Sequence, residues 1–221
     1  MTDWVALIPH LVHDIRALVR QGLANAQLVE RLAGSSLTPE AAARLQSTIC
    51  AQQDLNRLVT RIGALAEAEK QSDAVSLVEL DTAILTAKVH CQDPLDAASA
   101  EFSSVGIPAC LVPSAVTKIL IELLDNAVRY RHPERLLSIR IDAAQVGDRV
   151  EISVRDNGSS WDETYQAKLM QPLERLDSAR GGFGLGLAIA SALSESCGGL
   201  LRAEAGAGGS CFVLEVPATS T

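Results

Sequence analysis

The sequence lacks the features that would place it in a membrane, outside the cell or on a nucleic acid. It has no run of about 18 or more apolar residues, so no membrane-spanning helix is expected. The N-terminus is acidic at Asp3 and has no basic segment, which argues against a signal peptide. The formal net charge of −8 has the wrong sign for a nucleic-acid surface, because phosphate binding needs clustered Lys and Arg.

Paired cysteine motifs are also absent. The five cysteines are scattered and never in CxxC spacing: Cys50, Cys91, Cys110, Cys197 and Cys211. We therefore expect a reducing compartment, with neither disulfides nor a zinc site. The remaining composition is that of an ordinary globular protein, with 48% hydrophobic and 21% charged residues in a chain of 221. These features predict a cytoplasmic protein with no nucleic-acid partner and no membrane partner.

Apolar residues recur at helical spacing through the first 69 residues. One run comprises Trp4, Ile8, Leu11, Ile15, Leu18, Val29 and Leu32, and a second comprises Ala51, Leu55, Leu58, Ile62 and Leu65. Between them, AGSSLTPE predicts a loop with Thr38 as N-cap and Pro39 at the first helical position. This pattern predicts a helical hairpin over residues 1–69. Because two helices cannot hide such long seams from water, we expect two copies to pair as a four-helix bundle.

The first predicted helix carries a histidine followed by an acid, in LVHDIRAL. At about 100° per residue, Leu11 and Ile15 lie about 160° either side of His13, so the histidine points away from the apolar seam. Asp14 could accept a hydrogen bond from one ring nitrogen and leave the other as a nucleophile. Arg16 adds a cation that could approach a phosphate. Taken alone, the dipeptide favours an ordinary surface histidine that happens to neighbour an acid.

The rest of the chain reads as an α/β domain over residues 77–218, with KQSDAVS at 70–76 as the hinge before it. Two alternating runs, Ser138–Asp142 and Val150–Val154, are separated by a Gly147-Asp148 turn and predict a β-hairpin. The remaining predicted elements are helices over Pro113–Tyr130 and Leu185–Ser196 and strands near Leu200–Glu204 and Cys211–Val216.

Three stretches of this domain could carry chemistry. In IELLDNAVRYR, Glu122 and Asn126 are four residues apart and share one helix face, where an amide oxygen and a carboxylate would suit Mg²⁺. In VRDNGSS, Asp156 ends a strand and Gly158 permits a tight turn, so the carboxylate could bind an amino group of a ligand. In GGFGLGLAIA, glycines precede an apolar helix, where backbone amides could bind phosphates. Each stretch also has a plain reading, as a polar face, a turn or a loop.

Together, in this order, these stretches resemble the sensor histidine kinases of two-component signalling. LVHDIRAL is similar to that family's H-box, which implies that His13 is the phosphoacceptor and Asp14 its acidic neighbour. ELLDNAVRY is similar to the N-box. The roles this second match implies are Mg²⁺ binding by Asn126, assistance at the metal or γ-phosphate by Glu122, phosphate contact by Arg129 and nucleotide contact by Tyr130.

DNG resembles the first glycine box, which implies that Asp156 binds the adenine amino group beside Gly158. GFGLGL resembles the second glycine box and implies a phosphate-lining loop of Gly182, Gly184, Leu185, Gly186 and Leu187. The implied fold is a Bergerat-type α/β sandwich, a mixed sheet with helices on one face. The implied cofactors are ATP and Mg²⁺, and the implied partners are a second copy and the receiver domain of a response regulator.

The chain departs from the family pattern at several positions. Ser160 stands where the first glycine box usually has a second glycine, and the lid offers Met170 and Leu173 in place of a phenylalanine-centred motif. Ala17 occupies the position, four residues after the histidine, where a Thr or Asn would orient water for phosphatase activity, so that activity is expected to be weak or absent. No sensor segment precedes His13. Either the chain is the kinase core of a longer protein, or a separate sensor protein supplies its input.

Two other functions compete with an autokinase. A histidine phosphotransfer adaptor with a degenerate ATP-binding domain would keep the hairpin, but it usually loses the glycine boxes, and GFGLGL is intact. A mechanical ATPase of the gyrase type would use Glu122 to activate water and would leave the histidine-bearing hairpin without a role.

Overall fold

The structure is a computed structural model, and it describes residues 4–33, 36–70, 76–175, 177, 181–206 and 208–220. The chain forms two compact units, Met1–Glu67 and Ala68–Thr221. Of the predicted hinge at 70–76, residues 71–75 lie outside the described residues, while Lys70 ends a helix and Ser76 precedes a strand. Among the described residues, no helix is both long and apolar enough to cross a bilayer.

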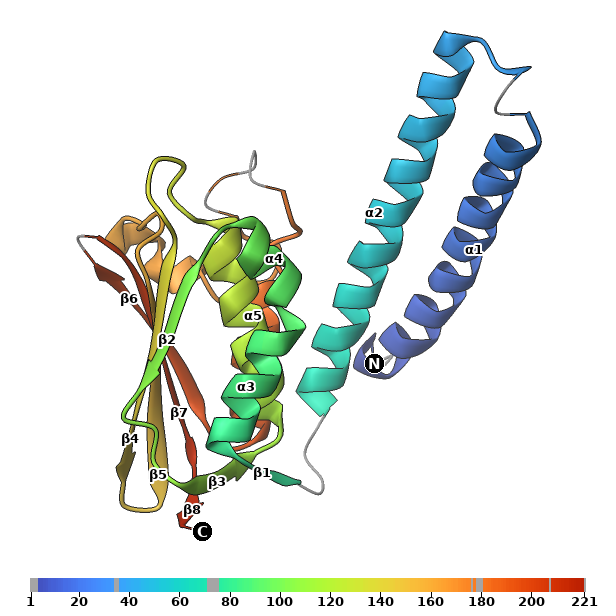
Figure 1. Cartoon of the computed structure of the whole chain (residues 1–221). Helices are drawn as coiled ribbons and strands as arrows, with labels where there is room; N and C mark the ends of the chain where they lie inside the picture. Colours follow the sequence, from blue (N-terminus) through green and yellow to red (C-terminus); the bar gives the residue numbers. More distant parts are fainter. Residues whose placement is uncertain are drawn as a thin grey trace. The chain divides into compact units, whose positions relative to one another are not determined.

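The first unit contains the predicted helical hairpin, α1 (Trp4–Ala33) and α2 (Pro39–Lys70; Figure 1). The start of α2 is capped as predicted, because the Ala41 N–H donates to Thr38 Oγ1 over 3.3 Å. The helices approach closely where α1 or α2 has a glycine. A Cβ at Gly63 would lie 3.1 Å from Val12 Cγ1, and one at Gly22 would lie 3.2 Å from Gln52 Nε2. These contacts fix the antiparallel pairing of the two helices.

The seam within one hairpin differs from the predicted apolar lines. On α1 it buries Val12, Val19 and Ala26, whereas Leu11, Leu18 and Leu32 of the predicted line are 59%, 68% and 77% exposed. On α2 it runs through Ile49, Gln52, Val59 and Gly63, beside the predicted line from Ala51 to Leu65. The side chain of Trp4 lies outside what the structure describes. Each helix therefore has two adjacent apolar faces, of which its own partner helix covers one.

The second unit is an α/β sandwich, as predicted. Its main sheet has the order β2-β4-β5-β7-β6, with β2 parallel to β4 and the other neighbours antiparallel. The strands are β2 (Glu101–Val105), β4 (Ser138–Val146), β5 (Arg149–Asp156), β6 (Leu200–Gly206) and β7 (Gly209–Pro217). A small second sheet joins β1 (Leu77–Glu79), β3 (Cys110–Pro113) and β8 (Thr219–Ser220). A 3-10 helix, η2 (Glu163–Lys168), follows β5.

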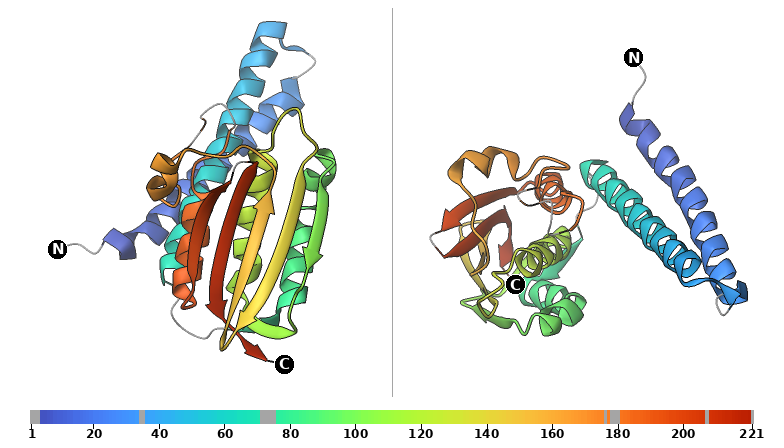
Figure 2. Two further views of the ribbon diagram at one scale, coloured as in Figure 1. Left: turned by 90° about the vertical axis from the view of Figure 1, so that its left-hand side faces the viewer. Right: turned by 90° about the horizontal axis from the view of Figure 1, so that it is seen from above.

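Helices cover one face of the main sheet and leave the other open (Figure 2, left). They are α3 (Leu80–His90), α4 (Gln92–Ala97), α5 (Ala115–Arg129) and α6 (Gly186–Ser196). The helix α5 packs between its neighbours with the predicted apolar stripe fully buried: Val116, Ile119, Leu120, Leu123, Leu124 and Ala127. This stripe fixes the rotation of α5, and so decides where its polar side chains point.

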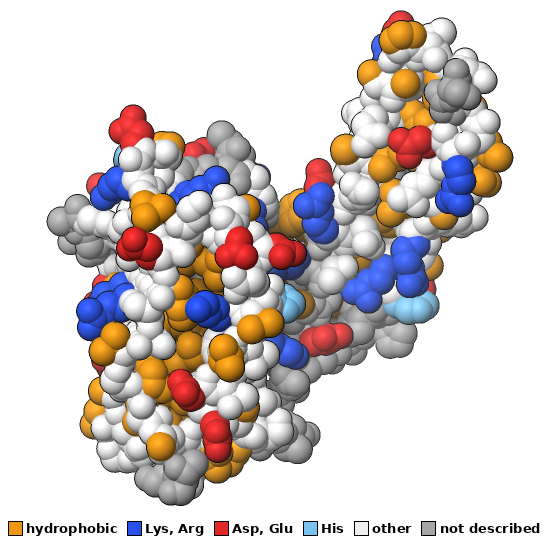
Figure 3. Space-filling view, in the orientation of Figure 1, with side chains coloured by type: hydrophobic (Ala, Val, Ile, Leu, Met, Phe, Trp, Pro, Cys, Tyr) orange, Lys and Arg blue, Asp and Glu red, His pale blue; other side chains and the backbone are white. Residues whose placement is uncertain are grey.

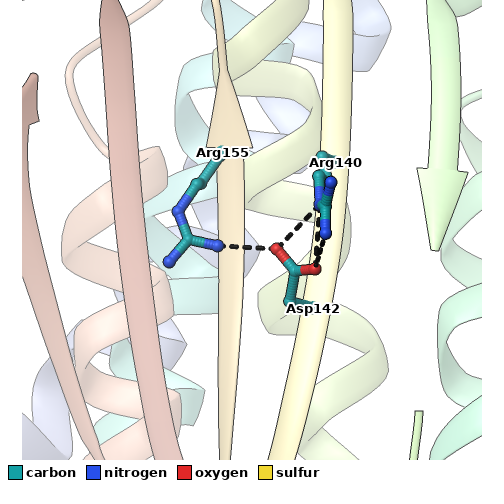
Figure 4. Close-up of polar contacts among 3 residues, drawn as sticks. All are labelled: Arg140, Asp142 and Arg155. Carbon is teal, nitrogen blue, oxygen red and sulfur yellow. Dashed lines mark hydrogen bonds and ion pairs between the residues drawn. The ribbon is translucent and has the colours of Figure 1, made fainter. Parts of the chain in front are cut away.

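The open face of the sheet is held by ion pairs between strands. Asp142 of β4 accepts from Arg140 Nε over 2.9 Å and from Arg155 Nη1 of β5 over 2.6 Å (Figure 4). The Arg140 hydrogen bond is the largest of the effects that hold the pKa of Asp142 below its ordinary value. Cross-strand pairs of opposite charge stabilise a solvent-facing sheet surface without burying it.

Candidate functional site

Asp156, at the end of β5, is the centre of a polar site on the helix-covered side of the sheet. The Gly158 N–H donates to Oδ1 over 2.8 Å, and the Ser210 hydroxyl of the neighbouring strand β7 donates to Oδ2. Burial raises the pKa of the Asp156 carboxyl, and the hydrogen bonds from Ser210 and Gly158 oppose that rise. The result is a half-buried carboxylate whose orientation is fixed from two directions.

Two glycines allow the backbone to close around this carboxylate. A Cβ at Gly158 would lie 2.7 Å from both Asp156 Oδ1 and the Tyr130 carbonyl oxygen. The Ser159 N–H donates to that same carbonyl over 2.8 Å, which ties the loop to the end of α5. At Gly209, a Cβ would collide with the Asp156 carbonyl oxygen at 1.8 Å. No other residue fits either position without moving backbone.

The polar face of α5 lies next to this loop. Glu122 and Asn126 are one turn apart on α5 and both are partly exposed. Arg129, the last residue of α5, pairs with Asp125 one turn earlier over 2.7 Å. Its guanidinium also lies against the glycine-rich loop, since a Cβ at Gly182 would be 2.7 Å from Nη1. The first and the third of the three predicted stretches, IELLDNAVRYR and GGFGLGLAIA, are therefore in contact through Arg129.

The glycine-rich loop enters α6 through two residues with left-handed backbone. Gly182 and Gly184 have φ of +81° and +65°, which favours glycine at both. Gly186 begins α6, Leu185 before it is buried, and Leu187 is partly exposed. The loop also holds the lid segment, because the Leu173 N–H donates to the Gly184 carbonyl over 2.8 Å. Unpaired N–H groups at such a helix start suit an anionic ligand.

His13 lies in the other unit, on α1. Its side chain is 76% exposed, and Nδ1 lies 3.2 Å from Asp14 Oδ1. The ring therefore points into solvent, as its helical position predicts. Of the predicted site residues, the structure brings the α5, β5 and α6 groups together within the second unit, and His13 and Asp14 form an exposed pair within the first unit.

Ser210 and Gly209 are missing from the predicted site. Gly209 is the last residue of GAGG and Ser210 follows it, at the start of an alternating strand. Glycine next to a strand is a signal of close backbone approach that could have pointed to them. Cys91 is a further neighbour of the α5 face. Burial, and then the charges of Asp125 and Glu122, raise the pKa of its thiol to about 11, which keeps it protonated.

Comparison with known proteins agrees with this geometry. Residues 112–220 match the family described as histidine kinase-, DNA gyrase B- and HSP90-like ATPase. The circadian input-output histidine kinase CikA of Synechococcus elongatus is 37% identical over 110 residues, which are 48% of this chain and 14% of CikA. The sensor protein IrlS of Burkholderia pseudomallei is 28% identical over 201 residues, which are 86% of this chain and 42% of IrlS. The chain thus spans less than half the length of either relative.

The fold also matches solved structures. Full-length ShkA, crystallised in complex with AMPPNP, superposes with a TM-score of 0.78 at 23% identity over 98% of this chain and 46% of ShkA. The Acinetobacter baumannii histidine kinase AdeS has a TM-score of 0.63 at 20% identity over 90% of this chain and 95% of that structure. Residues 112–220 thus belong to this ATPase family, and in its helical hairpin and ATPase-type domain the chain is similar to sensor histidine kinases.

Proposed function

We propose that this chain is an ATP-dependent autokinase that phosphorylates His13 and passes the phosphoryl group to an aspartate of a response regulator. The observation that carries the proposal is the convergence of Asp156, the α5 polar face and the glycine-rich loop around one site, together with an exposed His13–Asp14 pair on a separate helix. The AMPPNP named with ShkA supports a nucleotide as the ligand of this fold.

The proposed nucleotide site uses each group for a different part of ATP. Asp156 accepts a hydrogen bond from the adenine amino group, and its second oxygen stays engaged by Ser210. Tyr130 lies along the nucleotide from the end of α5. The phosphates meet Arg129 and the loop of Gly182, Gly184, Leu185, Gly186 and Leu187, whose backbone leaves N–H groups at the start of α6.

Asn126 and Glu122 are the proposed Mg²⁺ ligands. The amide oxygen and the carboxylate stand one turn apart on the exposed side of α5, which fits a hard cation. The phosphate oxygens of the nucleotide would supply further ligands to the ion. When bound, Mg²⁺ neutralises charge on the phosphates. Glu122 and Asn126 thereby position the γ-phosphate.

The chemistry at His13 follows from its contact with Asp14. With the proton on Nδ1 donated to the Asp14 carboxylate, the Nε2 lone pair is free to attack. The N–P bond forms as the bond from the γ-phosphorus to the bridging oxygen breaks, and ADP leaves with that electron pair. The Nδ1 proton passes to Asp14 or to water, which leaves a neutral ring that carries the anionic phosphoryl group on Nε2. When a regulator carboxylate attacks the phosphorus, an O–P bond forms and the N–P bond breaks. The electron pair of the broken bond stays on Nε2, and the ring takes back a proton on Nδ1.

A homodimer is the proposed assembly. Leu11, Leu18 and Leu32 form an apolar line on α1 that α2 of the same chain does not cover. On α2, Leu55 of the adjacent predicted line is also exposed. Such paired lines on two antiparallel helices are what a four-helix bundle buries when two hairpins associate. A separate sensor protein or a further domain of the same protein would supply the signal.

Labelling with γ-³²P ATP tests the proposal. We expect label that is stable in alkali and lost in acid, because a phosphoramidate bond has that stability, and we expect no label in His13→Gln. Label that resists acid would indicate a phosphoester and contradict a histidine kinase. ADP release without protein label would indicate an ATPase instead.

A further inference from the structure

Arg16 is a half-buried cation for which the described residues provide no ion pair. Its guanidinium lies against α2, since a Cβ at Gly63 would be 3.3 Å from Nη2. The Nε atom is buried and has no hydrogen-bond partner among the described residues. A charge taken partly out of water is costly unless an opposite charge or hydrogen bonds compensate it. We infer that Arg16 is a catalytic residue whose missing partner is the phosphoryl group in transfer to and from His13.

Other arginines of the hairpin show that pairing is available to this chain. Arg44 pairs with Glu40 one turn away over 3.0 Å, and Arg57 pairs with Asp54 over 3.0 Å. Arg16 has no such acid at its own helical spacings, because residues 12, 13, 19 and 20 are Val, His, Val and Arg. Among the described hairpin arginines, Arg16 is the one whose Nε is buried without a hydrogen-bond partner, and it lies beside the histidine, where an arriving anion can take the place of an acid.

The position of the guanidinium fits this role. Residues three apart on a helix are surface neighbours, so Arg16 lies next to His13. Gly63 also faces Val12, the residue before His13, because a Cβ at Gly63 would lie 3.1 Å from Val12 Cγ1. The Arg16 side chain thus extends back along α1 to the height of His13, as helical side chains do. On the hairpin face in Figure 3, Lys and Arg side chains gather next to a histidine.

The inference rests on the proposed phosphorylation of His13. As the N–P bond forms and the bond to the leaving oxygen breaks, negative charge stays on the nonbridging phosphoryl oxygens. The Arg16 N–H groups donate to those oxygens in both transfers, and no proton or electron pair moves to the arginine. A planar guanidinium suits this contact better than an ammonium. Gly63 keeps open the space in which the guanidinium lies.

Two phosphoryl donors test Arg16: ATP, which needs the second unit, and a small phosphoramidate, which does not. We expect Arg16→Gln to lower the rate of His13 labelling by about a hundredfold to a thousandfold with both donors, the range of one lost transition-state donor. The KM for ATP should stay within about twofold, because Arg16 is not in the nucleotide site, and Arg16→Lys should recover part of the rate. The melting temperature should not fall, since an unpaired charge has been removed.

Matched variants separate a specific contact from general effects. Arg20→Gln removes a charge from the same side of α1 about one turn after Arg16, and Arg44→Gln removes a paired charge, so both variants should label at nearly the normal rate. Gly63→Ala should lower labelling, whereas Gly22→Ala, which is equally tight against Gln52, should not.

Several results would overturn the role of Arg16. They are normal labelling of Arg16→Gln, an equal loss in Arg20→Gln, and a loss that follows a lowered melting temperature. If the wild-type protein fails to label with ATP, the proposed kinase activity is wrong. The phosphoramidate reaction still decides the role of Arg16 in that case, because it needs only His13 and its surroundings.

Discussion

Ser210 of β7 donates a hydrogen bond to the carboxylate of Asp156, which ends the neighbouring strand β5. The two residues are direct cross-strand partners, so the register of the sheet alone sets their contact. The bond favours the ionised carboxylate, whereas burial favours the neutral one, and burial has the larger effect on the pKa of Asp156. The nucleotide site thus depends on a carboxylate that one hydroxyl helps to keep charged.

Removing that hydroxyl should raise the pH below which nucleotide binding is lost. In Ser210→Ala the pKa of Asp156 rises further, so on acidification the carboxyl takes up its proton at a higher pH and stops accepting from the amino group. Affinity for an ATP analogue should fall by about 0.5–1.5 kcal/mol, and its decline with falling pH should begin earlier. Calorimetry across a pH series measures both. Ser210→Thr keeps the hydroxyl and Ser160→Ala changes an exposed serine, so a shift in either control would count against this explanation.

Alanine variants of two adjacent glycines can distinguish the effect of backbone strain from the effect of displacing Arg129. Gly181 and Gly182 have φ of +68° and +81°, but only at Gly182 would a Cβ meet the Arg129 guanidinium. Each alanine variant should lose about 1–2 kcal/mol of stability from left-handed backbone. Gly182→Ala should also weaken ATP binding by about tenfold, which is about 1.4 kcal/mol. Equal affinities in the two variants would show that Arg129 does not contact the phosphates.

The dimer should depend on the uncovered line of α1. Leu18→Glu places a charge where the second hairpin is proposed to pack, and sedimentation at micromolar concentration should then find a monomer. Leu85→Glu on α3 is a matched control, because Leu85 is 61% exposed against 68% for Leu18 but lies in the other unit. An unchanged dimer in Leu18→Glu would place the interface elsewhere.

We expect the phosphatase activity of this protein to be weak or absent. Ala17 is exposed one turn after His13, and a methyl group cannot hold a water by hydrogen bonding. The wild-type protein with ADP should therefore hardly accelerate dephosphorylation of a phosphorylated regulator, and Ala17→Thr should accelerate it. Fast dephosphorylation by the wild-type protein would show that another side chain orients the water.

Sequence periodicity predicted the elements whose pattern is local. The stripe of α5, the Gly147 turn and the Thr38 cap each lie within a few residues of their signals and are confirmed. The helix α3 escaped prediction because its N-cap, Glu79, makes no side-chain cap bond. The small sheet escaped because it joins residues 77–79, 110–113 and 219–220, which no local pattern connects.

The predicted site was limited in the same way. Asp156 and the glycine-rich loop stand out in the sequence, but Ser210 reaches the site only through the pairing of β5 with β7. On the hairpin, periodicity found the apolar line of each helix but could not say which of two adjacent faces meets its own partner helix. The unpaired state of Arg16 likewise depends on the packing of α1 against Gly63.

The position of the phosphate tests the central claim most directly. The full chain is incubated with Mg²⁺ and ATP, digested under alkaline conditions that preserve phosphohistidine, and mapped by mass spectrometry. The phosphate should lie on His13, with full occupancy retained in His10→Gln, a substitution on the same helix, and lost in His13→Gln and in Asn126→Ala. Phosphate on His10, on a serine or threonine, or on no residue of the wild-type protein would contradict the assignment of His13 as the phosphoacceptor.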